Sequence, residues 1–204
     1  ALELTKIYSI AGKLKDSFIT SRPVRSPHHT TSNVALVGGG ANPRPGEITL
    51  SHRGILFLDE FPEFPRNVLE ALRQPLEDGI VTVSRASGSL TFPAKFILVA
   101  AQNPCPCGYF GDGSKQCICS QGQIFKYQKK ISGPLLDRID LHVEVPRLSY
   151  EKMSENSIAE NSGSVKQRVE KARAIQRQRF GATKTNSEMS IVELKNFCAL
   201  DQPG

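Results

Sequence analysis

The sequence predicts an α/β protein in which helices flank a parallel sheet, on three observations. Residues 55–58 and 96–101 are uninterrupted apolar runs, which are typical of strands buried on both faces of a parallel sheet. Between these runs, apolar residues recur at the spacing of one helix face. Strand, helix and strand in this order are the pattern of a parallel sheet with crossover connections.

The composition excludes several classes of protein. Of the 204 residues, 39% are hydrophobic and 23% charged, which is usual for a globular protein that folds without disulfides. No apolar run approaches the roughly 20 residues of a membrane span. Lys and Arg number 26 against 20 Asp and Glu, and the net charge of +6 is compatible with nucleic acid as a partner. The first residues have the mixed charge of a helix and not the pattern of a signal peptide, so we expect a cytoplasmic protein.

The first part of the chain combines a helix with a region of turns. Residues 1–17 place apolar side chains at roughly helical spacing. Residues 21–54 are rich in Gly and Pro, which mark turns. Between these turns we expect residues 33–37 and 47–50 to pair as two short strands of a hairpin.

A helix and a second hairpin are predicted between the two apolar runs. Pro65 is well placed to open the helix, because proline is favoured in a first helical turn. Pro75 predicts a kink or an end of this helix. Residues 81–83 and 90–92 are predicted to form a β-hairpin.

The second apolar run is followed by a Cys-rich loop at 104–120. After this loop we expect a helix at 121–130 and a third strand at 141–145. The composition then shifts to Ser, Asn and Glu, which is typical of an exposed linker.

We therefore predict three parts: an α/β core at 1–146, a linker at 147–163 and a partial helical domain at 164–204. Within the last part, residues 165–180 have the pattern of a helix. Ser190 begins a capping box that opens another helix.

Polar side chains follow both apolar runs at the edge where a ligand would bind. In open α/β sheets, ligands lie outside the carboxyl ends of the strands. Asp59 could hold a Mg²⁺ ion that bridges nucleotide phosphates, and Glu60 could activate a water. The Asn103 amide could hold that water against a phosphate. Each residue alone also fits an ordinary polar turn, so the prediction depends on their combination.

Arg138 precedes the predicted third strand and has two interpretations. Its guanidinium could reach the phosphates of a neighbouring subunit as an arginine finger. Alternatively, it could pair with Asp137 or Asp140 at the surface of its own chain.

These residues together resemble a known family. Residues 54–61 are similar to the Walker B motif of AAA+ ATPases, Asn103 matches their sensor 1, and residues 135–140 resemble their arginine-finger segment. Four further segments resemble the magnesium-chelatase-like ComM (YifB) family, namely residues 22–30, 37–47, 72–78 and 103–108. The resemblance extends from residue 1 to about residue 200.

The resemblance implies an AAA+ P-loop-type sheet with β-hairpin inserts, followed by the start of a small helical lid domain. It implies a bacterial ATPase that uses ATP and Mg²⁺ and forms a ring, expected to be a homo-hexamer. ComM members are DNA helicases that promote branch migration during the integration of transforming DNA. In this pattern Asp59 assists Mg²⁺, Glu60 activates water, Asn103 senses the γ-phosphate, and Arg138 acts across the subunit interface.

DNA is the partner that the resemblance implies, with both hairpins facing the pore of the ring. Arg44, Arg53, Arg85 and Lys95 are then candidate phosphate contacts, although each one also fits a solvated surface charge. Adjacent histidines at 28 and 29 are expected to point in different directions, so we assign them to a subunit or DNA interface and not to a metal.

The chain departs from the family pattern in its phosphate-binding loop. No Gly-x-x-x-x-Gly-Lys-[Ser/Thr] sequence occurs in residues 1–204. The family's Walker A motif would lie upstream of Ala1, and its sensor 2 arginine beyond Gly204. We therefore expect a partial chain that binds nucleotide poorly and hydrolyses almost none by itself.

Four cysteines predict a structural Zn²⁺ site. Cys105, Cys107, Cys117 and Cys119 form two pairs that bracket a Gly-containing loop, which is how small tetrahedral zinc sites are built. Each pair has one intervening residue instead of the usual two, and reduced thiols or a reversible disulfide remain alternatives. Cys198 is expected in the core of its helical domain.

Two other functions are compatible with the sequence. The cysteine cluster and the positive charge would suit a zinc-stabilised nucleic-acid-binding module without enzymatic activity. A chelatase-type motor could instead act on a protein partner, in which case DNA would not stimulate hydrolysis.

Overall fold

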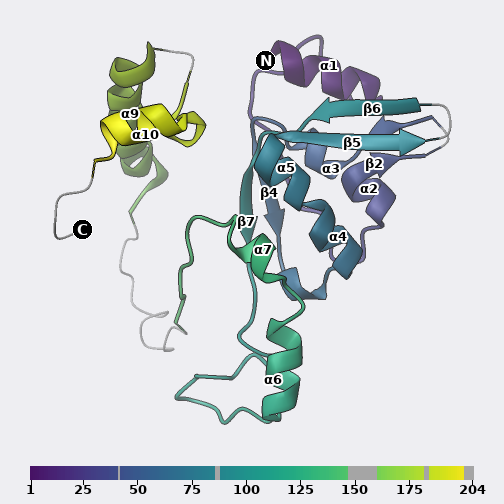
Figure 1. Cartoon of the computed structure of the whole chain (residues 1–204), viewed down its shortest axis with the longest axis vertical. Helices are drawn as coiled ribbons and strands as arrows, with labels where there is room; N and C mark the ends of the chain where they lie inside the picture. Colours follow the sequence, from purple (N-terminus) through teal and green to yellow (C-terminus); the bar gives the residue numbers. More distant parts are fainter. Residues whose placement is uncertain (41, 86–87, 147–159, 182–183, 200–204) are drawn as a thin grey trace. The chain divides into compact units, whose positions relative to one another are not determined.

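The computed structural model describes residues 1–40, 42–85, 88–146, 160–181 and 184–199. Most of the predicted linker at 147–163 lies outside these ranges. The chain divides into two compact units, Ala1–Arg147 and Leu148–Gly204, whose elements are drawn in Figure 1.

A three-stranded parallel sheet organises the first unit. Strand β4 (Ile55–Leu58) lies between β1 (Val24–Arg25) and β7 (Ile97–Ala100). Figure 1 shows β4 and β7 side by side, and the two strands pair along their full length with Leu58 opposite Ala100. The two strands predicted from apolar runs are therefore confirmed, and the fold is α/β with helices flanking a parallel sheet.

One face of the sheet packs on the main core, and the other is open. Leu56 and Leu58 are fully buried in a cluster that includes side chains of the helices and of the β5–β6 hairpin described below. On the other face, Val24, Ile97 and Val99 are 65%, 64% and 43% exposed. The expectation that both long strands are buried on both faces is therefore wrong for β7, because the described part of the chain leaves one of its faces uncovered.

The predicted hairpin at 33–37 and 47–50 is wrong, since both segments are helices. These are α2 (Asn33–Val37) and α3 (Glu47–Leu50). The Ser32 side chain accepts a hydrogen bond from the Ala35 N–H, which caps the start of α2. The hairpin that does form is shorter and lies between the helices, where β2 (Gly38–Gly39) pairs with β3 (Arg44–Pro45).

Helix α1 (Leu2–Ile10) confirms the N-terminal helix but ends before residue 17. Its buried Leu4 and Ile7 face the unit, and the Tyr8 hydroxyl donates a hydrogen bond to the Leu50 carbonyl at 3.0 Å. The helix is thereby fixed against α3.

The segment after β4 is helical in three short pieces. A 3₁₀ turn, η1 (Phe61–Glu63), is followed by α4 (Arg66–Ala71) and α5 (Arg73–Asp78). Pro65 is the residue that precedes α4, and Pro75 lies in the first turn of α5. A proline is tolerated there because first-turn N–H groups have no helical partner, so the predicted interruption of the helix is confirmed.

The second predicted hairpin is confirmed, and the third predicted strand is wrong. Strands β5 (Ile80–Arg85) and β6 (Gly88–Pro93) pair antiparallel from end to end. Residues 141–146 form no strand, and Leu141, Val143 and Val145 are each about 80% exposed. Their alternating apolar pattern therefore has no strand partner in the described chain.

Two helices follow the Cys-rich loop. Helix α6 (Gln121–Gln128) begins in a capping box, in which Ser120 and Gln123 exchange side-chain and backbone hydrogen bonds. The predicted helix at 121–130 is thus confirmed. A single-turn helix, α7 (Gly133–Leu136), comes next and buries Leu135.

The second unit contains α9 (Ser162–Phe180), the 3₁₀ turn η3 (Asn186–Glu188) and α10 (Ile191–Phe197). The predicted capping box at Ser190 is present, and the Phe180 and Phe197 rings meet edge to face at 5.5 Å. Cys198 is exposed, so its predicted place in a core is wrong. Among the described helices, none is long and apolar enough to cross a membrane.

A buried histidine connects α1 to the sheet. His52 Nδ1 accepts the Lys95 N–H at 3.1 Å, and Nε2 lies 3.2 Å from a Glu3 carboxylate oxygen. This arrangement suits a neutral imidazole that carries its proton on Nε2. Burial lowers the pKa of His52 below 6.5, and the Glu3 carboxylate opposes this effect only in part.

We predict that His52 makes stability depend on pH. Because its folded pKa lies below its unfolded value, the unfolded chain binds more protons in that window, and stability falls as the pH drops through the unfolded pKa near 6.5. Urea unfolding should give a lower free energy of unfolding at pH 5 than at pH 7.5. In His52→Gln the difference between the two pH values should be smaller. His142 is exposed, so His142→Gln is the matched control. It should show the same difference in the free energy of unfolding between the two pH values as the parent. If the parent and His52→Gln lose the same free energy of unfolding between pH 7.5 and pH 5, His52 is not the cause of the pH dependence.

A second prediction concerns Gly54, where β4 begins beside β1. A Cβ at this position would clash with the Pro23 carbonyl oxygen and ring. Gly54→Ala should therefore destabilise the chain by about 1–3 kcal/mol, as overpacking does. Gly122 in α6 has open space around its Cα, so Gly122→Ala should be neutral or slightly stabilising. Chemical denaturation measures both, and equal effects would show that the β1–β4 approach tolerates a side chain.

Candidate functional site

The carboxyl ends of β4 and β7 bring the predicted acidic and amide residues to one edge. The Ala101 N–H donates to the Leu58 carbonyl and the Phe61 N–H donates to the Ala101 carbonyl, at 3.0 and 2.9 Å. These two bonds extend the ladder past the last paired residues. Asp59 and Glu60 lie between the bonded positions and are exposed.

Glu60 has an unusual backbone conformation. Its φ of 51° and ψ of 45° are left-handed, and its N–H donates to Asp59 Oδ1 at 2.8 Å. A side chain in this region costs about 1–2 kcal/mol relative to the right-handed conformation. The turn directs the chain from β4 into η1 and leaves both carboxylates at the surface.

A histidine pair that we expected to diverge meets the Glu60 carboxylate. His29 Nδ1 lies 2.8 Å from Glu60 Oε2, and the rings of His28 and His29 are tilted by 36° with their centroids 4.0 Å apart. One potential ligand atom from each of the three residues lies within 4.8 Å of the others. The expectation that the histidines point apart is therefore wrong. Adjacency in sequence gave no signal for this contact, because it depends on the path of the chain after β1.

Asn103 is exposed at the same edge of the sheet, three residues after β7 ends. It borders a shallow pocket of about 230 Å³ that Tyr127 and Ile131 also line. Burial raises the pKa of Tyr127, and hydrogen bonding from the Asn103 backbone opposes this effect in part. Asn103 therefore lies beside an aromatic side chain of α6.

Arg138 is held within its own chain. The guanidinium forms an ion pair with Glu77 of α5 and donates a hydrogen bond to the Pro134 carbonyl. The ion-pair partner of Arg138 is therefore Glu77, and not Asp137 or Asp140 as the sequence suggested. Its side chain is 23% exposed, so a rotation that breaks the Glu77 pair is needed before it can reach another subunit.

The four basic residues predicted to contact DNA lie in different places. Arg53 and Lys95 are adjacent, because the Arg53 N–H donates to the Lys95 carbonyl at 2.5 Å. Arg53 also binds the Glu3 carboxylate at 3.4 Å. Arg44 is exposed on β3, and Arg85 ends β5, although its side chain lies outside what the structure describes. The structure thus joins one pair and leaves the other two on separate hairpins.

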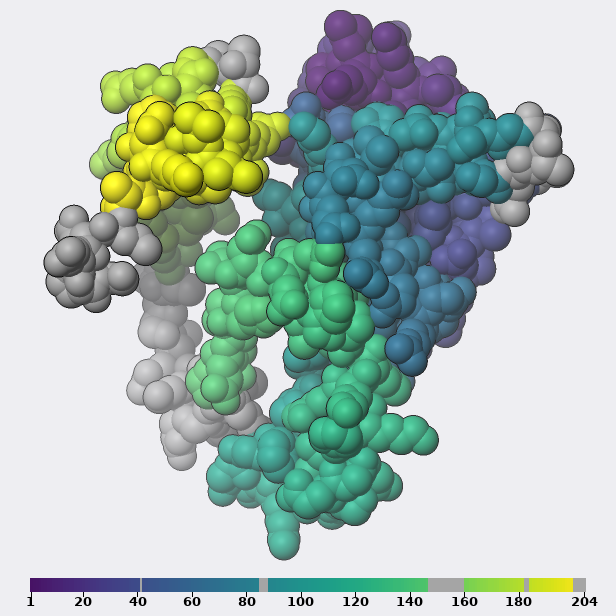
Figure 2. Space-filling model, viewed as in Figure 1, coloured from purple at the N-terminus to yellow at the C-terminus, as the bar shows by residue number. Residues whose placement is uncertain are grey.

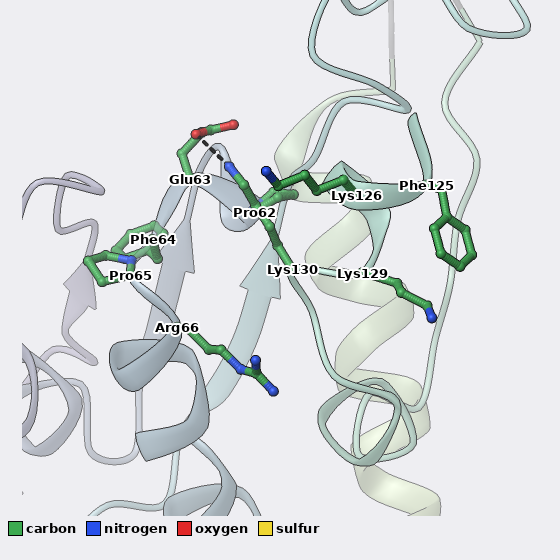
Figure 3. A pocket seen from close by; sticks show the side chains of 9 residues that line it. All are labelled: Pro62, Glu63, Phe64, Pro65, Arg66, Phe125, Lys126, Lys129 and Lys130. Atoms are coloured by element: carbon green, nitrogen blue, oxygen red, sulfur yellow. Dashed lines mark hydrogen bonds and ion pairs between the residues drawn. The ribbon is translucent and has the colours of Figure 1, made fainter. Parts of the chain in front are cut away.

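A basic groove was not found from the sequence. It has a volume of about 620 Å³ and lies between the start of α4 and one side of α6. Figure 3 shows Arg66 on the α4 side and Lys129 and Lys130 on the α6 side, with a dashed line from Lys130 to Glu63. That ion pair spans 3.0 Å, and the Lys129 ammonium lies 4.2 Å from the centre of the Phe125 ring. The spacing of the lysines on the predicted helix was the available signal.

The four predicted metal ligands are brought together. One Sγ atom from each of Cys105, Cys107, Cys117 and Cys119 lies within 4.8 Å of the others. Hydrogen bonding from the Tyr109 backbone is the main cause that lowers the pKa of Cys107 to about 6. All four are free cysteines.

Two family models match nearly the whole chain. The model described as magnesium chelatase, subunit ChlI, matches residues 1–153. The model described as the ChlI C-terminal part matches residues 159–204.

Curated relatives agree with these models. Competence protein ComM of Haemophilus influenzae is 47% identical over 88% of this chain and 35% of its own length. Uncharacterized protein YifB of Escherichia coli is 46% identical over the same shares. The chloroplastic magnesium-chelatase subunit ChlI of Chlamydomonas reinhardtii is 28% identical over 60% of this chain and 25% of its own. The chain thus spans about a third of the length of the ComM and YifB relatives.

The left-handed backbone of Glu60 generates a stability prediction. At most positions Ala is more stable than Gly, because Gly loses more entropy on folding. At position 60 the order should reverse, with Glu60→Gly more stable than Glu60→Ala by about 1 kcal/mol, since Gly adopts positive φ without strain. Glu63 is the matched control, because it lies in η1 and is not among the residues with positive φ. Glu63→Gly should be less stable than Glu63→Ala in urea unfolding. If Ala is also more stable than Gly at position 60, the left-handed backbone of Glu60 is not strained.

Proposed function

Because the chain belongs to the family described as magnesium chelatase, subunit ChlI, we propose that the full-length protein is an AAA+ ATPase that binds Mg²⁺–ATP and hydrolyses it to remodel DNA. The observation that carries the proposal is the shared edge of β4 and β7. Adjacent parallel strands are followed there by two carboxylates and an amide, which are groups that can hold a metal ion and position a water for phosphoryl transfer.

Each residue of this edge has a proposed role. Asp59 would hold the Mg²⁺ ion, which would neutralise charge on the nucleotide phosphates, and Glu60 would take the proton of the attacking water. Asn103 holds that water against the γ-phosphate with its amide. His29 already contacts the Glu60 carboxylate, so we assign it the orientation of that carboxylate before nucleotide binds.

A ring is part of the proposal because the family resemblance implies that Arg138 acts across a subunit interface. As an arginine finger it would leave Glu77 and bind the γ-phosphate held by a neighbouring subunit. A charge-assisted bond to phosphate is stronger than an exposed ion pair with a carboxylate, which favours the exchange. We propose a homo-hexamer as the ring.

DNA is the proposed substrate of the motor. The two hairpins carry Arg44 and Arg85, and the Arg53–Lys95 pair adds positive charge beside the sheet. Phosphate contacts of this kind supply most nonspecific affinity for DNA. The groove lined by lysines of α6 offers a further basic surface, with an aromatic ring on which a base could stack. The name of the ComM relative associates that protein with competence.

We predict that Glu60→Gln lowers the ATPase rate of the full-length protein by about 100-fold or more, as loss of a general base does. ATP affinity should stay within a few-fold, because the change keeps Asp59, the proposed Mg²⁺ residue, and preserves the size of the side chain at position 60. Glu144→Gln is the matched control, since Glu144 is an exposed carboxylate that does not line the basic groove. Phosphate release with and without branched DNA measures both rates.

The outcomes separate the proposed motor from its alternatives. Hydrolysis that rises with DNA and is lost in Glu60→Gln supports the DNA motor. An ATPase rate that does not change when DNA is added would contradict DNA as the substrate and favour a motor that acts on a protein. DNA binding without ATP hydrolysis would contradict the proposed ATPase activity and favour a zinc-stabilised nucleic-acid-binding module.

A further inference from the structure

The loop that joins β7 to α6 gathers four cysteines at one point. Figure 2 shows this segment and α6 protruding from the body of the first unit. Cys105 is fully buried although the segment is short and largely polar. Ile118, between the second pair of cysteines, is 85% exposed. A loop that exposes its isoleucine and buries a cysteine is not folded around an apolar core.

The sulfur positions have the dimensions of a tetrahedral metal site. The Sγ of Cys105 lies 3.4 Å from that of Cys107 and 3.8 Å from that of Cys117, and the last two are 3.6 Å apart. Four sulfurs around one ion at a Zn–S distance of about 2.3 Å are separated by about 3.8 Å. Cys119 completes the set, because its Sγ lies within 4.8 Å of the other three.

The backbone of the loop supports this convergence. Backbone groups of Tyr109 and Ile118 both contact the Cys107 side chain, so the two halves of the loop converge on this cysteine. Gly108 and Gly111 have φ of 81° and 82°, which lets the chain turn sharply after the first cysteine pair. These turns allow the second cysteine pair to return to the first.

We propose that Cys105, Cys107, Cys117 and Cys119 bind one structural Zn²⁺ ion. Four thiolates fill all positions of a tetrahedral ion, so the ion has no open site for water or substrate. Its role is to fix the loop at both ends. Cys105 lies two residues after Asn103, and Cys119 directly precedes the Ser120 cap of α6.

The ion therefore connects the edge of the sheet to the helix that carries the basic groove. One contact beside it has the same effect, since the Gln128 amide donates to the Pro104 carbonyl at 3.3 Å. Without the ion, four sulfurs at these distances would lose their common partner. This role does not depend on whether the protein hydrolyses ATP.

The test is the metal content of the full-length protein purified without added metal. Elemental analysis should give one zinc per chain, and Cys107→Ser and Cys117→Ser should each lose most of it. Cys198→Ser is the matched control, because Cys198 is an exposed cysteine outside the cluster and should leave the zinc unchanged. Variants that keep the zinc of the parent, or a parent that contains iron in its place, would overturn the proposal.

A second measurement uses only the unaltered sequence, in case the cysteine variants fail to fold. Zinc is removed with a thiol reagent and a chelator, the thiols are restored, and Co²⁺ is added. Tetrahedral thiolate coordination should give intense visible d–d bands that Zn²⁺ abolishes at one equivalent. A folded protein that takes up neither ion, or that is isolated with disulfides in the loop, would contradict the site.

The positioning role has its own readout. Limited proteolysis should cut the loop between Cys107 and Cys117 at least 10-fold faster in the zinc-free protein than in the loaded one. The Lys166–Arg179 segment of α9 is the internal reference, because it lies in the other unit and should be cut at an equal rate in both forms. Equal protection of the loop in both forms would show that the ion does not fix it.

Discussion

The parallel pairing of β4 with β7 is the constraint on which the rest of the first unit depends. It fixes where two segments about 40 residues apart in sequence emerge from the sheet. The bonds from Ala101 to Leu58 and from Phe61 to Ala101 carry the pairing past the last strand residues. Because the register is fixed by buried Leu56 and Leu58, a slip of one residue would turn both leucines to the open face and move Asp59 and Glu60 together. The core and the polar edge are therefore determined by the same pairing.

Sequence patterns predicted the long-range frame and failed where short elements depend on local contacts. The apolar run of β4, the capping box at Ser190 and the β5–β6 hairpin all have strong signals that a single segment carries. Residues 33–37 are too few to distinguish the apolar period of a strand, 2 residues, from that of a helix, 3.6 residues. The hydrogen bond from the Ala35 N–H to Ser32 caps this segment as a helix. At 141–145 the alternation is genuine, but a strand also needs a partner, which alternation alone does not supply.

The candidate site shows the same division between chain order and side-chain contacts. Asp59, Glu60 and Asn103 follow apolar runs, so their placement at one edge could be predicted from topology. The contacts of Glu60 with His29 and of Arg138 with Glu77 join segments whose relation no pattern encodes. The cysteines were predictable as a group because their spacing is itself a signal, although the short interval within each pair is unusual.

The ionic contacts that occupy the candidate groups are compatible with a site that changes partners. Glu77–Arg138 and Glu63–Lys130 each include a side chain that is at least 42% exposed, and ion pairs with such access to water contribute at most about 1 kcal/mol. A bound phosphate with its metal ion offers each cation a stronger, charge-assisted bond. The loop after Asn103 is different if it holds the proposed zinc ion, because four thiolates around one ion would not be exchanged at comparable cost. The edge of the sheet therefore combines side chains that can be redirected by a ligand with a neighbouring loop that would stay fixed while they move.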